Sequence, residues 1–198
     1  MFVQVITGKT SDRDALRAQL DRWPAELKAG AVGYLGGTLG IADDGTLIGL
    51  ARFVDAASAA KNAERPEQGV WWEQTAKLLD GEATFRESSD VTLLFDGGSD
   101  KATFVQIMQG TIADRAKAES FESGEMLDQL RSARPDLLGG VRVWLDGGKY
   151  VEAAYFTSEA DARKNEASAE FAGPQAEYAA LFGEMTFTDL RDPLLDTA

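Results

Sequence analysis

The sequence of 198 residues contains no cysteine and no histidine. The absence of cysteine excludes a disulfide scaffold, a thiolate nucleophile and every cysteine-ligated metal or iron–sulfur site. The absence of histidine excludes Ser–His and Cys–His catalysis, His-ligated haem, and most zinc and non-haem iron sites. We therefore expect no resident metal and no cofactor.

Basic residues are scarce, since 20 Lys and Arg stand against 33 Asp and Glu and give a net charge of −13. Such a chain repels phosphate backbones and anionic lipid, so we expect neither nucleic acid nor a membrane surface as a partner. Long apolar runs are also missing, and the N-terminus lacks the basic and apolar regions of a signal peptide. These features predict a cytoplasmic protein.

What the sequence does contain is a repeat. The chain opens with FVQVITGKTSDR at Phe2, and FVQIMQGTIADR begins 102 residues later at Phe104, with six of twelve positions identical. Two further pairs match in the same order: Phe53–Asn62 with Phe156–Asn165, and Asp80–Phe85 with Phe182–Phe187. We interpret this as a tandem duplication. The predicted repeats span 1–95 and 103–192, with a Gly-rich linker over 96–102 and a C-terminal tail over 193–198.

Each half shows the same order of hydrophobic patterns. The first half predicts a strand over 2–7, a helix from Ser11 or Asp12, a hairpin of strands over 34–42 and 46–53, helices over 55–66 and 68–79, and a strand over 83–94. The second predicts a strand over 103–109, a helix over 113–134, a hairpin turning at 146–148, a helix capped by Ser158 that runs to Phe171 and resumes after Pro174, and a strand over 184–190. The order β-α-β-β-α-β is the ferredoxin-like α+β plan.

A sheet with helices on one side leaves its other face open, yet Phe2–Ile6 is mostly apolar on both faces. We therefore expect the two antiparallel sheets to pack face to face, as a pseudo-dimeric α/β barrel within one chain. Gln4 and Gln106 interrupt the apolar pattern at equivalent places, and their amides are expected to satisfy each other near the pseudo-twofold axis. A monomer is expected, with a further homodimer left open.

This arrangement resembles the dimeric α+β barrel superfamily, most closely its antibiotic-biosynthesis-monooxygenase-like branch. The resemblance lies in the element order, in the tandem copy, and in the stretch from Phe53 to Asn62, with a looser counterpart from Phe156 to Asn165. Many relatives carry His at the last position of that stretch, where both copies here carry Asn.

The resemblance implies a small-molecule pocket between the sheet and its helices. In the first half it implies a lining of Asn62, Trp71, Trp72, Tyr34, Arg52 and Arg86. The Trp pair would stack on a planar aromatic ligand, Asn62 would bind an oxygen, and Arg86 or Arg52 would stabilise a phenolate. The alternative is that one Trp is core and its neighbour caps the outer face.

The second half offers Asn165, Trp144, Arg142, Tyr155 and Tyr178. Gly173-Pro174 stand where the first half has its Trp pair, so the two cavities are not expected to be equivalent and the first is favoured. Two glycine-rich stretches, Gly8-Lys9-Thr10 and Gly33–Gly40, lack the context of a phosphate loop or a dinucleotide fold.

Two functions remain open. One is a cofactor-independent monooxygenase of aromatic phenols or quinols, with Asn62 and Arg86 as catalytic residues. The other is a non-catalytic small-molecule-binding or interaction protein that kept the barrel and lost the chemistry. An isomerase or a small-molecule stress protein on the same scaffold is also left open.

Overall fold

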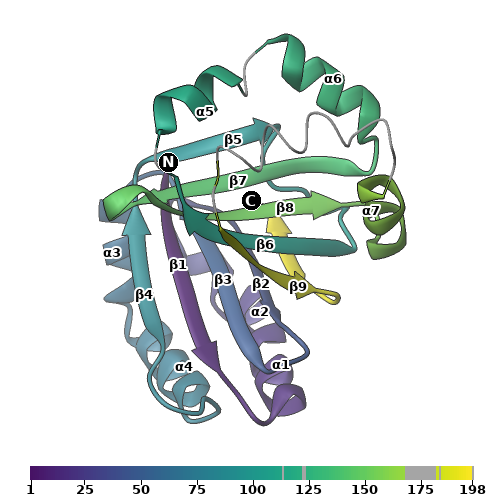
Figure 1. Cartoon of the computed structure of the whole chain (residues 1–198). Helices are drawn as coiled ribbons and strands as arrows, with labels where there is room; N and C mark the ends of the chain where they lie inside the picture. The colour runs from purple at the N-terminus through teal and green to yellow at the C-terminus, as the bar shows by residue number, and fades with distance from the viewer. Residues whose placement is uncertain (113, 122–123, 168–181, 183, 198) are drawn as a thin grey trace. The chain divides into compact units, whose positions relative to one another are not determined.

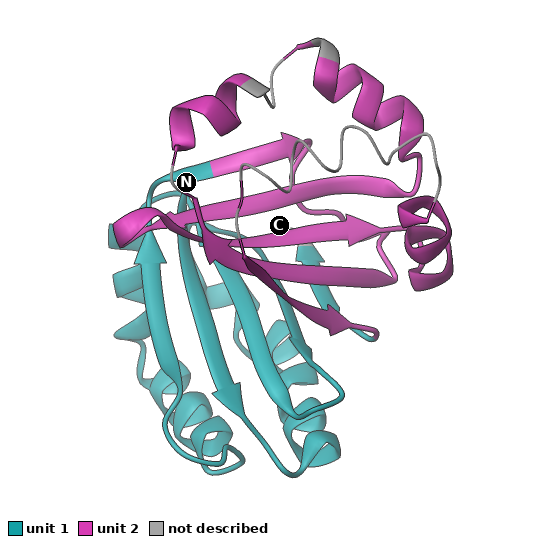
Figure 2. Ribbon diagram, in the orientation of Figure 1, with its two compact units in different colours: residues 1–91, 192–198 teal, residues 92–191 magenta. Residues whose placement is uncertain are grey.

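The computed structural model describes residues 1–112, 114–121, 124–167, 182 and 184–197. The chain forms two compact units, residues 1–91 together with 192–198, and residues 92–191 (Figure 2). Each unit contains one five-stranded antiparallel sheet with helices (Figure 1). Within the described residues, no helix has both the length and the apolar character needed to span a bilayer.

The first unit follows the predicted order of elements. Its sheet has the strand order β10-β2-β3-β1-β4. The elements are β1 (Phe2–Lys9), α1 (Arg13–Asp21), α2 (Trp23–Glu26), the 3-10 turn η1 (Lys28–Gly30), β2 (Tyr34–Ile41), β3 (Thr46–Phe53), α3 (Ala56–Ala63), α4 (Pro66–Ala76), β4 (Thr84–Ser88) and β10 (Leu194–Thr197).

Local signals in the sequence set these boundaries. The side chain of Asp12 accepts a hydrogen bond from the backbone of Ala15 at 3.0 Å and caps α1, and Asp55 caps α3 in the same way. Pro66 begins α4, where its missing N–H has no partner to lose. Gly45, with φ of +82°, turns the hairpin between β2 and β3. The predicted caps and hairpin are therefore confirmed.

The helices of this unit cover one face of its sheet. Leu16 and Leu20 from α1 and Leu27 beyond α2 are buried with Leu47 of β3 and Trp71 of α4. Because side chains alternate along a strand, Leu47, Gly49, Ala51 and Phe53 share this helix face. The opposite face is also apolar and buried: Val3, Val5, Ile48 and Leu50 are at most 1% exposed.

The second unit repeats the plan with the strand order β5-β7-β8-β6-β9. Its elements are β5 (Val91–Phe95), β6 (Phe104–Thr111), α5 (Arg115–Phe121), α6 (Glu125–Ala133), β7 (Leu137–Leu145), the 3-10 turn η2 (Asp146–Gly148), β8 (Lys149–Phe156), α7 (Glu159–Glu166) and β9 (Met185–Leu190). Ser158 caps α7, as predicted. The predicted helix over 113–134 is instead two helices, and the one expected after Pro174 lies outside the described residues.

The strands near the end of each repeat differ from the prediction in their number and in the sheet that they join. The expected strand over 83–94 is two strands in different sheets, because β4 pairs with β1 whereas β5 joins β7. The expected tail over 193–198 contains β10, which pairs with β2. Each sheet thus gains a fifth strand from the segment that follows the other repeat. The added strand satisfies backbone groups that an open edge would leave unpaired.

The prediction that Gln4 and Gln106 satisfy each other is wrong. Gln4 Nε2 donates to Glu87 Oε1 at 2.6 Å, and Gln106 Nε2 donates to Asp189 Oδ1 at 3.0 Å. Each carboxylate is the cross-strand partner of its glutamine within the same sheet. Two neighbouring strands are therefore enough to satisfy each amide. The face-to-face packing of the two sheets stays a prediction.

Truncating the core beneath α1 tests this packing. Leu16 is fully buried, so Leu16→Ala should lower the free energy of unfolding by about 2–5 kcal/mol, through lost transfer energy and the cavity left behind. Val70→Ala, on the exposed side of α4 at 55% exposure, is the matched control and should change it by about 0.5 kcal/mol or less. Urea denaturation followed by far-UV circular dichroism measures both; equal losses would contradict the assigned core.

Candidate functional site

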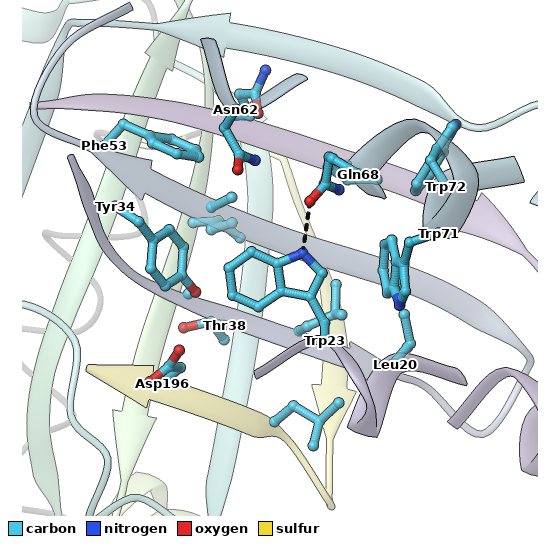
Figure 3. A pocket seen from close by; sticks show the side chains of 18 of the residues that line it. Leu20, Trp23, Tyr34, Thr38, Phe53, Asn62, Gln68, Trp71, Trp72 and Asp196 are labelled. Carbon is cyan, nitrogen blue, oxygen red and sulfur yellow. Dashed lines mark hydrogen bonds between the residues drawn. The ribbon is translucent and has the colours of Figure 1, made fainter. Parts of the chain in front are cut away.

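A cavity of about 460 Å³ lies in the first unit between the helix face of the sheet and its helices (Figure 3). All five strands contribute to its lining, and so do α1 to α4. Its volume falls within the range of about 300–1,000 Å³ that is usual for small-molecule pockets.

Small residues form the centre of the cavity floor. Gly37 of β2 pairs with Ala51 of β3, and Gly49 of β3 pairs with Leu39 of β2. A Cβ atom on Gly37 would lie 2.6 Å from the hydroxyl oxygen of Tyr34, and one on Gly49 would collide with Leu39. The two glycines therefore let the side chains of Tyr34 and Leu39 lie low across the sheet, beneath the cavity and its helices.

Aromatic rings form the walls. Trp23 lies against Tyr34, with ring centroids 4.9 Å apart, and Tyr34 meets Phe53 edge-on at 5.6 Å. On the α4 side, Trp72 packs edge-on against Phe85 of β4 at 5.0 Å. The indole N–H of Trp23 donates to Gln68 Oε1 at 2.9 Å, which fixes its ring (Figure 3). Rings held in place on several sides suit a flat apolar ligand.

Polar groups occupy the two ends of one row across the sheet. The pairing register aligns Asp196 with Gly37, Gly37 with Ala51, Ala51 with Gln4, and Gln4 with Glu87. The row therefore has a carboxylate on each edge strand and small residues near its centre. Among the described residues that line the cavity, none is Lys or Arg.

Asp196 lies at the β10 end of this row. Lys28 Nζ donates to its Oδ1 at 2.5 Å, and Arg52 Nη2 donates to its backbone oxygen at 3.4 Å. Its other carboxylate oxygen, Oδ2, is buried and has no hydrogen-bond partner among the described residues. A buried acceptor without a donor is costly, so this atom is ready to accept from a ligand.

The hydroxyl of Tyr34 points to the same end of the cavity as the carboxylate of Asp196 (Figure 3). Burial raises the pKa of Tyr34 above its ordinary value, the negative charge of Asp196 raises it further, and Arg52 partly opposes this. Tyr34 therefore stays protonated at neutral pH and keeps a hydrogen to donate.

Four of the residues predicted from the sequence line this cavity together: Asn62, Trp71, Trp72 and Tyr34. Arg65 Nη1 donates to Asn62 Oδ1 at 2.9 Å, so the oxygen of Asn62 is already engaged. Trp71 is 7% exposed, and its indole N–H is buried without a hydrogen-bond partner among the described residues. Both neighbouring Trp residues line the cavity: Trp71 belongs to the buried core, and the ring of Trp72 reaches Phe85.

Arg52 and Arg86 are not on the cavity. Alternation places Arg52 on the opposite face from Ala51 and Phe53, and Arg86 on the opposite face from Phe85 and Glu87. Burial lowers the pKa of Arg86. The family resemblance implied both arginines, but the strand register directs them away from the aromatic walls.

The second unit uses the equivalent positions differently. Its register places Arg142 where the first unit has Leu39, and Glu152 where it has Gly49. Arg142 Nε donates to Glu152 Oε2 at 2.7 Å, and both side chains are at most 5% exposed. The guanidinium of Arg142 also lies 4.6 Å from the ring of Phe182. A buried ion pair thus stands at the positions that border the hollow in the first unit.

The other predicted residues of this unit are satisfied within it. Trp144 Nε1 donates to Thr92 Oγ1 at 2.9 Å, and Asn165 Nδ2 donates to Asp136 Oδ1 at 2.6 Å. Tyr178 lies outside the described residues. Asn62 and Asn165 therefore occupy equivalent positions with different hydrogen-bond partners.

The sequence analysis missed several residues of the site. The sequence predicts Gln4 on the other face of the sheet. For Trp23, only its large aromatic side chain and its place before Pro24 could have indicated a role in the site. No sequence feature indicated Asp196, because the residues around it predict only a C-terminal tail. Within the described residues, no three carboxylates gather as a metal site.

Comparisons with known proteins agree on the fold. No protein-family model matches the sequence, and no curated protein matches it either. Among solved structures, the chain is similar to a candidate monooxygenase from Fusobacterium nucleatum (10% identity, TM-score 0.76, 99% of this chain and 94% of that one). It is also similar to a candidate monooxygenase from Lactobacillus acidophilus (10%, 0.73, 99% and 96%) and to an anthrone oxidase-like protein (9%, 0.61, 100% and 93%). The predicted resemblance to monooxygenases of this kind is confirmed for the fold.

The ion pair of the second unit can be tested by a double-mutant cycle. Arg142→Leu or Glu152→Gly alone should lower the free energy of unfolding by about 3–5 kcal/mol, since each leaves a buried charge without its partner. The double variant, which restores the residue types of the first unit, should lose clearly less than the sum of the two. Denaturant unfolding measures all three, and additive losses would show that the pair is not coupled.

Proposed function

We propose that the first unit binds a flat aromatic small molecule in its cavity. The observation that carries this proposal is an aromatic-walled hollow of about 460 Å³ over a floor of glycine and alanine. The rings of Trp23, Tyr34 and Trp72 offer stacking and edge contacts, and such contacts are worth about 0.5–1.5 kcal/mol each beyond the apolar area they bury.

The lining also limits the charge of the ligand. Asp196 and Glu87 are carboxylates, and no cation among the described residues lines the cavity. A bound anion would meet like charge in a partly desolvated site, so a neutral ligand with hydrogen-bond donors is favoured. This revises the expectation that an arginine holds a phenolate there.

We further propose that the bound molecule is oxidised by O₂ without a cofactor. Support comes from the fold shared with candidate monooxygenases and an anthrone oxidase-like protein. With anthrone, one O₂ would give anthraquinone and one water: one oxygen atom becomes the new carbonyl, and the other leaves with both hydrogens of the ring methylene. Asp196 or Glu87 would accept the first proton, and the amide N–H of Asn62 would bind the substrate oxygen.

A second candidate is a protein that binds such a molecule without turnover. The contact between Arg65 and Asn62 favours it, because the amide oxygen at the site of the usual family His is already engaged. Glu87, bound by Gln4, is likewise partly occupied as a base.

Filling the floor tests the binding proposal. Ala51→Leu adds a branched side chain to the centre of the cavity and should weaken binding of two- and three-ring aromatics by at least roughly tenfold. Ala60→Leu, on an exposed position of α3, is the control and should leave binding unchanged. Quenching of tryptophan fluorescence, calibrated by calorimetry, gives the affinities. Unchanged binding to Ala51→Leu would place the ligand elsewhere.

Oxygen uptake tests the catalytic proposal. Purified protein, treated with a chelator, should consume one O₂ per anthrone and release anthraquinone faster than buffer alone. Asn62→Ala should lower this rate by roughly tenfold or more while leaving affinity for anthracene unchanged, because anthracene has no oxygen to bind. Tight binding of anthrone without oxygen uptake would favour the non-catalytic candidate.

A further inference from the structure

The β10 end of the cavity carries a donor and an acceptor close to one another. Asp196 Oδ2 is buried and has no hydrogen-bond partner among the described residues, and the hydroxyl of Tyr34 points to the same place (Figure 3). Tyr34 is one of the residues predicted to line the aromatic pocket, whereas Asp196 is not. Together they define a polar subsite at one end of an apolar cavity.

The carboxylate of Asp196 is held for this use from two sides. Lys28 binds the other oxygen, Oδ1, at 2.5 Å, and the backbone of Asp196 pairs with Gly37 in the sheet. Gly37 in turn leaves room for the Tyr34 hydroxyl, which a Cβ atom there would displace. The ion pair with Lys28 compensates the negative charge, so the subsite does not require a cationic ligand.

Only some ligand groups satisfy both partners. A hydroxyl oxygen accepts from the Tyr34 O–H and donates its own hydrogen to Asp196 Oδ2. An ether or a carbonyl oxygen accepts from Tyr34 but leaves Asp196 without a donor. An ammonium group donates to Asp196 but offers nothing to the Tyr34 hydrogen.

We propose that Asp196 and Tyr34 select a ring hydroxyl, so that the cavity takes hydroxylated polycyclic aromatics in preference to their ethers or parent hydrocarbons. This rests on the proposed function of the same cavity. The ring system lies over Gly37 and Ala51 with its hydroxyl at the β10 end, along the row that leads to Gln4 and Glu87. A strand at the far end of the chain thus supplies the specificity of the first unit.

The test compares 2-naphthol, 2-methoxynaphthalene and naphthalene, with dissociation constants measured by calorimetry. The wild-type protein should prefer 2-naphthol over the methoxy compound by roughly tenfold or more, since the ether leaves a buried carboxylate oxygen unpaired. Asp196→Asn should remove most of this preference while leaving the affinity for naphthalene unchanged, which shows that the cavity is intact.

Two variants separate recognition from structure. Lys28→Gln removes the cation that holds Oδ1 but keeps the acceptor Oδ2, so it should reduce the preference for 2-naphthol clearly less than Asp196→Asn does. Asp192→Asn removes a carboxylate from the exposed pair with Arg17, just before β10, and should retain the preference. A preference that persists in Asp196→Asn, or is lost equally in Lys28→Gln, overturns the assignment of Asp196. If none of the three compounds binds the wild-type protein, the proposed function itself fails.

Discussion

The small residues at the centre of the first sheet are the constraint from which the site follows. Gly37, Gly49 and Ala51 face the helices, and the side chains that lie over the two glycines, those of Tyr34 and Leu39, come from neighbouring positions of β2. In a core packed to ordinary density, such a gap would be closed by collapse of the helices. Here bulky rings brace the helices along the rim, with Trp23 against Tyr34 and Trp72 against Phe85. The same rings that hold the gap open form its binding walls.

The second repeat shows what the same backbone does when these positions are filled. Arg142 and Glu152 stand at the places of Leu39 and Gly49, and their ion pair lies beside the ring of Phe182. Burying this ion pair costs the hydration energy of both charged groups, and their mutual attraction roughly offsets that cost. The pair therefore adds little net stability, but the loss of one partner would leave an unpaired buried charge. The two repeats share one strand plan, yet at this pair of positions the first unit has leucine and glycine beside a cavity, whereas the second has a buried ion pair.

Much of this fold could be predicted from the sequence, because repeats, caps and hairpin turns are local signals. The family resemblance likewise implied an aromatic pocket with Asn62, Trp71 and Tyr34 in its lining. The errors share one cause. Which face Arg52, Arg86 and Gln4 occupy depends on strand register, and a shift of one residue reverses every face. The exchange of β5 and β10 between the sheets was not predictable either, since the edge that a short strand joins is decided by tertiary structure.

The position of Asp196 sets the polarity of one end of the cavity. A cavity lined by tryptophan and leucine alone would bind any flat hydrocarbon and distinguish little. β10 adds a carboxylate at one edge of the sheet, while Glu87 stands at the other. Arg52 donates to the backbone oxygen of Asp196 and Lys28 binds its carboxylate, but neither cation lines the cavity. Under the proposed function, the site thus selects for polar groups without favouring anions, and oxidation there would begin from a neutral, protonated ligand.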